Sequence, residues 1–145
     1  MSLEPETDLV HTASVELVND ISELCRLGRL THDILRPFAV SDGDLFRIDL
    51  VLEELATNIV KYGFNDQARH LIRFDFQLRR HGVEIKITDD GLPFDPFSGP
   101  GKQLPASLEE AQVGGLGVHL VKLYANACRY ERSGGKNITT LTFNT

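Results

Sequence analysis

Residues 70–89 read HLIRFDFQLRRHGVEIKITD, and this stretch decides the fold. Apolar and polar residues alternate over residues 70–78 and again over residues 83–88. Such alternation is typical of strands that are buried on one face only. Residues 79–82 lie between the two runs and end in Gly82, which suits a turn. The stretch therefore predicts a β-hairpin whose apolar face must be covered by another layer.

Two predicted helices precede the hairpin and can supply that layer. Apolar residues recur at helical spacing over residues 17–35, and Pro37 favours the end of this helix. A second helix is expected after Ser41, which would cap it while Asp44 reaches back as in a capping box. Gly63 is expected to end it. Residues 9–15 predict a strand at a sheet edge, and the buried stripe of the second helix is expected to contain Ile48, Leu52, Leu55 and Ile59.

The C-terminal third adds a long loop, a helix and a second hairpin. Residues 91–113 contain four prolines and form a loop long enough to be functional. Residues 117–125 resume helical spacing, and residues 128–132 and 138–143 predict strands around Gly134 and Gly135. The predicted fold class is α+β: one domain, a two-layer α/β sandwich with a mixed, mostly antiparallel sheet and helices on one face.

Composition narrows the classes of partner. The chain has 145 residues, 41% hydrophobic residues and a net charge of −6, as expected for a soluble globular domain without a basic face for nucleic acid or an anionic membrane. No apolar run approaches the roughly 20 residues of a membrane helix. The acidic N-terminus does not resemble a secretory signal, so we expect a cytoplasmic protein. Cys25 and Cys128 lack CxxC spacing and are expected to be reduced core residues.

The second predicted helix carries one candidate site. Glu54, Asn58 and Lys61 are spaced at i, i+4 and i+7, so they share one helix face. Mg²⁺ needs only one or two protein oxygen ligands when phosphates complete its shell, so Asn58 suffices as the metal ligand. Glu54 is then placed to act as a general base. The alternative interpretation is a solvated helix face with a Glu–Lys pair.

Two further motifs contain glycine. Residues 88–94, TDDGLPF, end a predicted strand. Asp89 can accept a hydrogen bond from an adenine amino group, and Gly91 allows the backbone to approach the base closely. The alternative interpretation of this motif is a plain turn. Residues 114–118, GGLGV, precede a predicted helix, whose free N–H groups suit a phosphate; a hinge is the alternative. Neither a Walker motif nor a Rossmann fingerprint is present.

In this order the three motifs resemble the GHKL superfamily of ATP-binding domains. ELATN at 54–58 matches its N box, DDGLPF at 89–94 its first glycine box, and GGLG at 114–117 its second. The resemblance covers about residues 8–144. Within the superfamily, the sequence is most similar to the small bacterial anti-sigma factor serine/threonine-protein kinases. It implies a Bergerat-type fold with a lid over ATP at about residues 95–113.

The resemblance also implies roles for individual residues. Glu54 would be the catalytic base, Asn58 the Mg²⁺ ligand, and Asp89 the adenine acceptor. A threonine in the last strand would assist Asp89, and Thr139 is favoured over Thr140. The implied nucleotide-binding residues are Asn58, Lys61, Asp89, Gly91, Phe94, Gly114, Gly115, Leu116, Gly117, Val118 and Thr139.

The implied function is an ATP- and magnesium-dependent kinase that regulates transcription. Its substrate would be a STAS-domain antagonist (an anti-anti-sigma protein), and it would sequester a sigma factor and form a homodimer through the first helix or the N-terminal strand. One alternative is a GHKL module that binds ATP without kinase activity, and another is an interaction domain without nucleotide. His32 also begins a stretch, HDILRPF, similar to a histidine-kinase phosphoacceptor box, but only 22 residues separate it from Glu54, so a surface histidine is favoured.

Overall fold

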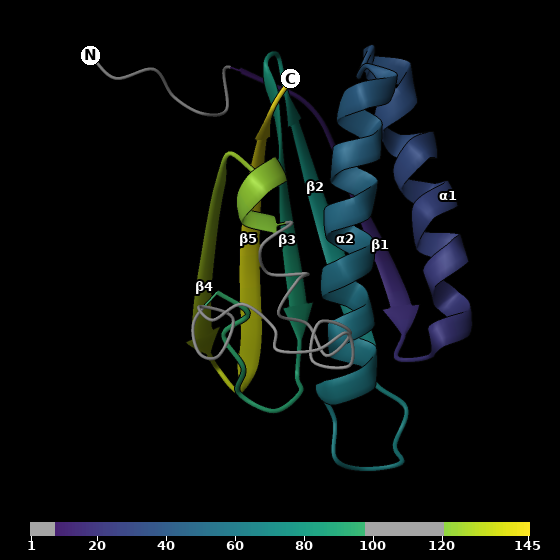
Figure 1. Cartoon of the computed structure of the whole chain (residues 1–145), viewed down its shortest axis with the longest axis vertical. Helices are drawn as coiled ribbons and strands as arrows, with labels where there is room; N and C mark the ends of the chain where they lie inside the picture. Colours follow the sequence, from purple (N-terminus) through teal and green to yellow (C-terminus); the bar gives the residue numbers. More distant parts are fainter. Residues whose placement is uncertain (1–7, 98–120) are drawn as a thin grey trace, which may run out of the picture.

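A five-stranded sheet with helices against one face forms the two layers of the molecule (Figure 1). This computed structural model describes residues 8–97 and 121–145. Within them the strands are β1 (Leu9–Val18), β2 (Leu71–Arg79), β3 (Gly82–Asp89), β4 (Ala127–Ser133) and β5 (Lys136–Asn144). The α-helices are α1 (Leu24–Leu35) and α2 (Asp42–Tyr62), and the short 3-10 helices are η2 (Ile21–Glu23) and η3 (Arg36–Phe38). Residues 121–124 are also helical.

The strand order is β1-β2-β3-β5-β4, and every neighbouring pair is antiparallel. Strand β1 lies at the edge, as the sequence predicted, and β5 is inserted between β3 and β4. Local hairpins join β2 to β3 and β4 to β5, whereas the β3–β5 pair joins distant segments. The predicted α+β class with a sandwich of two layers is confirmed.

The turn between β4 and β5 requires glycine at both of its central positions. Gly134 and Gly135 have φ angles of 59° and 77°, the left-handed region that a two-residue hairpin turn requires. This turn sets the register in which Asn137 faces Arg132 on β4, and the separate β3–β5 pairing places Asn137 opposite Asp89. Residues directly opposite each other share a face of the sheet. Asp89, Asn137 and Arg132 therefore lie on one face.

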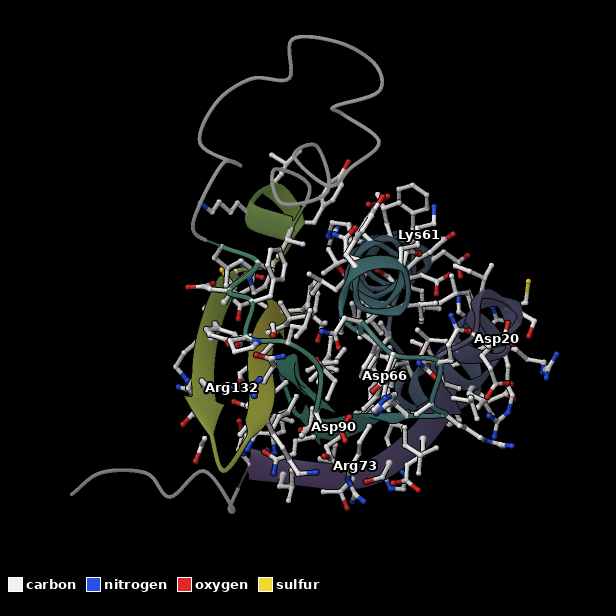
Figure 2. The ribbon with its side chains drawn as sticks, turned by 90° about the horizontal axis from the view of Figure 1, so that it is seen from below. Asp20, Lys61, Asp66, Arg73, Asp90 and Arg132 are labelled. Carbon is white, nitrogen blue, oxygen red and sulfur yellow. The ribbon has the colours of Figure 1, made fainter. Side chains whose placement is uncertain are left out.

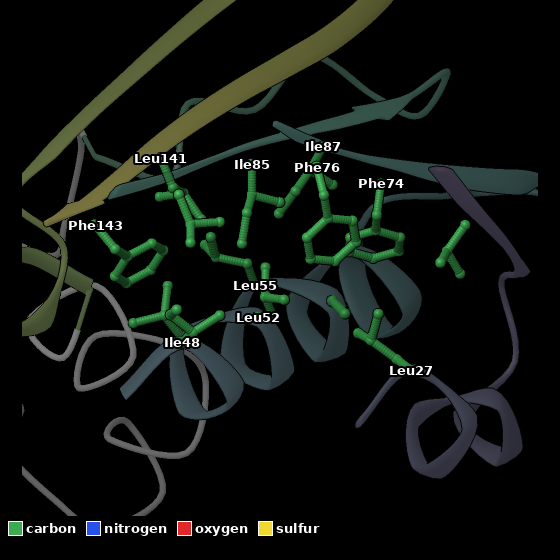
Figure 3. Packing of buried hydrophobic residues seen from close by; sticks show 14 of the residues in the cluster. Leu27, Ile48, Leu52, Leu55, Phe74, Phe76, Ile85, Ile87, Leu141 and Phe143 are labelled. Carbon is green, nitrogen blue, oxygen red and sulfur yellow. The ribbon is translucent and has the colours of Figure 1, made fainter. Parts of the chain in front are cut away.

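The core lies between α2 and the sheet (Figure 3). Ile48, Leu52 and Leu55 are buried as predicted, whereas Ile59 packs at the margin and is only partly buried. Fully burying one such side chain contributes about 1.5–3 kcal/mol, so this stripe holds α2 firmly in place. Its partners across the interface include Phe74, Phe76, Ile85, Ile87 and Leu141.

The first helix begins later than predicted. Leu17 is a buried residue of β1, which continues to Val18, and α1 starts only at Leu24. Leu17 pairs with Ile72 on β2, so its burial comes from the sheet although its spacing to later leucines suits a helix. The chain changes direction at Asp20, whose carboxylate accepts from the backbone N–H of Ser22 at 2.9 Å.

Two local details also differ from expectation. Ser41 caps α2 by accepting from the N–H of Asp44 at 3.1 Å, but the Asp44 carboxylate contacts Arg47 one turn later instead of reaching back. Cys25 is exposed on α1 and does not belong to the core, whereas Cys128 is partly buried against it. Both thiols are free. Gly63 ends α2 as predicted, and its N–H donates to Ile59 O at 2.8 Å.

Candidate functional site

The C-terminal end of α2 and the loop that follows β3 meet at one end of the molecule (Figures 1 and 2). The N–H of Leu92 donates to the carbonyl oxygen of Gly63 at 2.7 Å. A Cβ added at Gly91 would lie well under 3.0 Å from that same oxygen, so only glycine fits there. This contact fixes α2, with its polar face, beside Asp89.

Glu54, Asn58 and Lys61 follow one another along α2 as predicted. Glu54 and Asn58 are half-buried, and Lys61 is exposed in the last turn (Figure 2). None of the three side chains forms a hydrogen bond or ion pair with another residue of the described part of the chain. No Glu54–Lys61 ion pair is present among the described residues, and the three polar groups stay candidates for binding a ligand.

Asp89 is the most unusual polar group at this end of the molecule. It is only 6% exposed, and its Oδ1 accepts from the N–H of Gly91 at 2.9 Å and from Asn137 Nδ2 at 3.0 Å. Its Oδ2 has no hydrogen-bond partner among residues 8–97 and 121–145. A buried carboxylate oxygen without a donor is costly, so this atom suits a ligand that brings an N–H group, as adenine does.

Thr139 supports the same interpretation. It pairs with Ile87, is 7% exposed, and lies on the face of the sheet that carries Asp89. Its hydroxyl also has no hydrogen-bond partner within the described residues. Thr140 pairs with Lys86 on the opposite face, so the geometry favours Thr139, as the sequence interpretation did.

Three polar residues next to Asp89 were missed from the sequence. Asn137 bonds Asp89, Tyr130 donates its hydroxyl to Asn137 Oδ1, and Arg132 Nη1 donates to Gly91 O at 2.8 Å. Asn137 occupies an inward-facing position of β5, where alternation calls for an apolar residue. That break in the pattern was the available signal.

The remaining sequence-predicted site residues have different outcomes. Phe94 is 53% exposed, and its N–H donates to Asn137 Oδ1 at 3.3 Å. Of the predicted lid at 95–113, only residues 95–97 are described, and there Asp95 Oδ1 accepts from the N–H of Phe97 at 2.8 Å. Residues outside the described part of the chain are Gly114, Gly115, Leu116, Gly117 and Val118, so their phosphate contacts stay a prediction.

A histidine that the sequence interpretation passed over joins this site to the loop after α2. His70 Nε2 lies 2.8 Å from Asp66 Oδ1, and His70 Nδ1 lies 3.1 Å from Asp90 Oδ1. Its ring stacks on Phe64 with centroids 4.2 Å apart. The hydrogen bond to Asp66, followed by that to Asp90, raises the pKa of His70. The histidine thus ties residues 63–70 to the neighbour of Asp89 (Figure 2).

His32 lies elsewhere, in the last turn of α1. Its Nε2 is 3.2 Å from Asp49 Oδ2 on α2, and it lines a surface hollow of about 680 Å³ with Arg29 and Arg36. This placement agrees with the favoured interpretation of a histidine near a helix end.

The described residues contain neither a cluster of metal ligands nor a membrane-spanning helix. Within residues 8–97 and 121–145, no three His, Cys, Asp or Glu side chains gather as an all-protein metal site would need. The amide oxygen of Asn58 suits Mg²⁺ as one ligand beside phosphates. In the same part of the chain, no helix is both long and apolar enough to cross a bilayer.

Comparison with known proteins identifies the family of the chain. Residues 17–143 match the family model of the histidine kinase-like ATPase domain. The chain is 33% identical over 97 residues to the serine/threonine-protein kinase BtrW of Bordetella bronchiseptica, covering 67% of this chain and 68% of that protein.

Two solved structures share the fold. The crystal structure of the RsbU and RsbW domains of Rv1364c from Mycobacterium tuberculosis matches 92% of this chain with a TM-score of 0.62 and 15% identity. The present chain spans about a third (32%) of that one. The histidine kinase domain of the blue-light activated histidine kinase EL346 from Erythrobacter litoralis matches 84% of this chain and 59% of its own length, with a TM-score of 0.54 and 16% identity. With a family model that spans most of its length, this chain belongs to the histidine kinase-like ATPase domain family.

Proposed function

We propose that the chain is an ATP-dependent serine/threonine-protein kinase that acts as an anti-sigma regulatory factor. In this proposal it phosphorylates a STAS-domain antagonist, sequesters a sigma factor and works as a homodimer in the cytoplasm. The single observation that carries nucleotide binding is the buried Asp89 carboxylate, one oxygen of which has no donor among the described residues. The protein-kinase assignment rests on the name of the similar BtrW protein and on the presence of both Glu54 and Asn58, one turn apart on α2.

Nucleotide would be held from two sides. Asp89 accepts the adenine amino group, with the Thr139 hydroxyl beside it on the same face of the sheet. Asn58 on α2 offers its amide oxygen to Mg²⁺, which when bound neutralises charge on the phosphates. Lys61 on the next turn and the glycines at 114–117 would border the phosphates, and residues 95–113 would cover them as a lid.

Glu54 would handle the proton of the transfer. The hydroxyl oxygen of the acceptor serine or threonine forms a bond to the γ-phosphorus, the bond to the bridging oxygen breaks, and ADP leaves. Glu54 accepts the hydroxyl proton during this exchange. A half-buried carboxylate without an intramolecular partner in the described part of the chain is free to do so.

Phosphorylation would act on the partner through charge. A phosphate group adds about −1.5 to −2 charges at neutral pH, which disfavours an apolar or acidic interface. The present chain is acidic overall, with a net charge of −6. A phosphorylated antagonist would therefore be released, and the kinase would be free to bind its sigma factor.

The test is transfer of labelled phosphate from ATP to candidate STAS-domain proteins. Glu54→Gln should reduce transfer by about 10²–10⁴-fold, the usual contribution of a general base, while ADP binding stays within about threefold. Glu53→Gln is the matched control, because Glu53 is exposed and precedes Glu54 on a different part of the helix surface. Asn58→Ala should weaken nucleotide binding only when Mg²⁺ is present.

The outcomes separate the alternatives. Transfer that survives Glu54→Gln contradicts the assigned base. Tight ATP binding by the wild-type protein without transfer to any STAS protein supports a regulatory module that binds ATP without kinase activity. Absence of any thermal shift with Mg-ATP contradicts nucleotide binding altogether.

A further inference from the structure

Asn137 uses every hydrogen-bonding position of its side-chain amide. Its Nδ2 donates to Asp89 Oδ1 at 3.0 Å and to Leu92 O at 2.9 Å. Its Oδ1 accepts from the Tyr130 hydroxyl and from the N–H of Phe94 at 3.3 Å. An asparagine offers two donors and two acceptor positions, so this amide is saturated. At 5% exposure it is also almost completely buried, and its orientation is therefore fixed.

These contacts join three segments around Asp89. Strand β5 contributes Asn137, β4 contributes Tyr130, and the loop after β3 contributes Leu92 and Phe94. On β4, Arg132 adds a further bond to Gly91 O at 2.8 Å, which holds the same loop. The loop is thus fastened by side chains from the two strands beyond it.

The consequence falls on the two oxygens of Asp89. Oδ1 receives two donors, the N–H of Gly91 and Asn137 Nδ2. With Oδ1 fixed in this way the carboxyl group cannot rotate freely, and Oδ2 is held as the oxygen without a donor from the described residues. A fixed acceptor discriminates well between a ligand with a matching N–H and a ligand that presents an oxygen there.

We propose that Asn137 is a positioning residue for base selection: it orients Asp89 so that Oδ2 accepts from a purine bearing an exocyclic amino group, and it disfavours a purine bearing a carbonyl at that position. This inference rests on the proposed binding of adenine nucleotide at Asp89. It adds the residue that makes the carboxylate selective. Asn137 itself does not contact the base.

The experiment compares Mg-ADP with Mg-IDP by titration calorimetry, because hypoxanthine carries a carbonyl where adenine carries the amino group. Wild-type protein should bind ADP at least about 30-fold more tightly than IDP, a threshold well below the ~10⁴–10⁵-fold by which the most selective hydrogen-bonding sites reject a mismatched ligand. In Asn137→Ala the ADP affinity should fall about 10-fold and the IDP affinity about threefold or less, so that the ratio shrinks. Asn144→Ala is the matched control, since Asn144 is exposed on the same strand and contributes its backbone N–H to Asn126.

Tyr130→Phe guards against a variant that fails to fold. It removes only the hydroxyl that holds Asn137 Oδ1, and it should narrow the ADP-to-IDP ratio in the same direction by a smaller factor. An equal loss of affinity for both nucleotides would show a merely structural role and overturn the inference, as would an unchanged ratio in both variants. Wild-type protein that binds neither nucleotide refutes the proposed function itself, whereas wild-type selectivity that persists in the variants refutes only the role of Asn137.

Discussion

Replacing Gly91 with alanine tests the contact that joins α2 to the loop after β3. The added Cβ would meet the carbonyl oxygen of Gly63, which is backbone and cannot swing away, and would lie 2.9 Å from Asp89 Oδ1. The loop must therefore move and the 2.7 Å bond from Leu92 N to Gly63 O must break. Losing such a bond costs about 1 kcal/mol, and overpacking adds about 1–3 kcal/mol. We expect Gly91→Ala to lower the free energy of unfolding by about 2–4 kcal/mol.

Thermal unfolding followed by circular dichroism measures this change. For a domain of this size about 2–4 kcal/mol corresponds to a Tm lower by roughly 6–12 °C. Gly43→Ala is the control, because a Cβ there meets nothing closer than 3.9 Å and alanine favours the first turn of α2. The control should keep or slightly raise the Tm. If the two variants melt within about 2 °C of each other, the close contact between Gly91 and Gly63 does not contribute the expected free energy of unfolding.

Two further predictions concern titration and thiol chemistry. The pKa of His70 is raised, chiefly by its hydrogen bond to Asp66 and also by Asp90. The charged imidazolium therefore stabilises the fold below about pH 6.5. This contribution is lost as the pH rises through the folded-state pKa. Between pH 5.5 and 8.5 the Tm of wild-type protein should therefore fall more than that of His70→Gln, and parallel pH profiles would contradict the assignment. Exposed Cys25 should be alkylated at pH 7.5 at least ~10-fold faster than Cys128, because burial raises the pKa of the Cys128 thiol. Timed mass spectrometry measures both rates, and equal rates would refute the difference.

Much of the fold was predictable because its signals are local. The alternation at 70–89, the Ser41 cap and the pair Gly134 and Gly135 each fix a hairpin or helix without help from distant residues. The predicted start of α1 was wrong because Leu17 satisfies helical spacing and strand alternation equally well. Asp20, which caps the 3-10 helix η2 by accepting from Ser22 N, marks the true end of the strand, and Glu23 Oε1 accepts from Val18 N at 3.0 Å just before it.

Candidate site residues could be named from the sequence only where they belong to a contiguous motif. Asp89 and Gly91 lie in one such motif, whereas Asn137 reaches them through the β3–β5 pairing, across 48 residues of sequence. No local pattern reveals which strands will be neighbours in a sheet. The hydrogen bond between His70 and Asp90 was not predicted for the same reason, because the two residues are 20 positions apart in the sequence.

The insertion of β5 between β3 and β4 has a consequence for the order in which the chain can assemble the proposed site. Synthesis proceeds from the N-terminus, and β5 leaves the ribosome after β1, β2, β3 and β4. Until residues 136–144 have emerged, β3 and β4 lack the strand that joins them, and Asp89 lacks its amide partner. A chain clipped before residue 136 would lack Asn137, so Asp89 Oδ1 would lose the side-chain donor on which the proposed base selection depends.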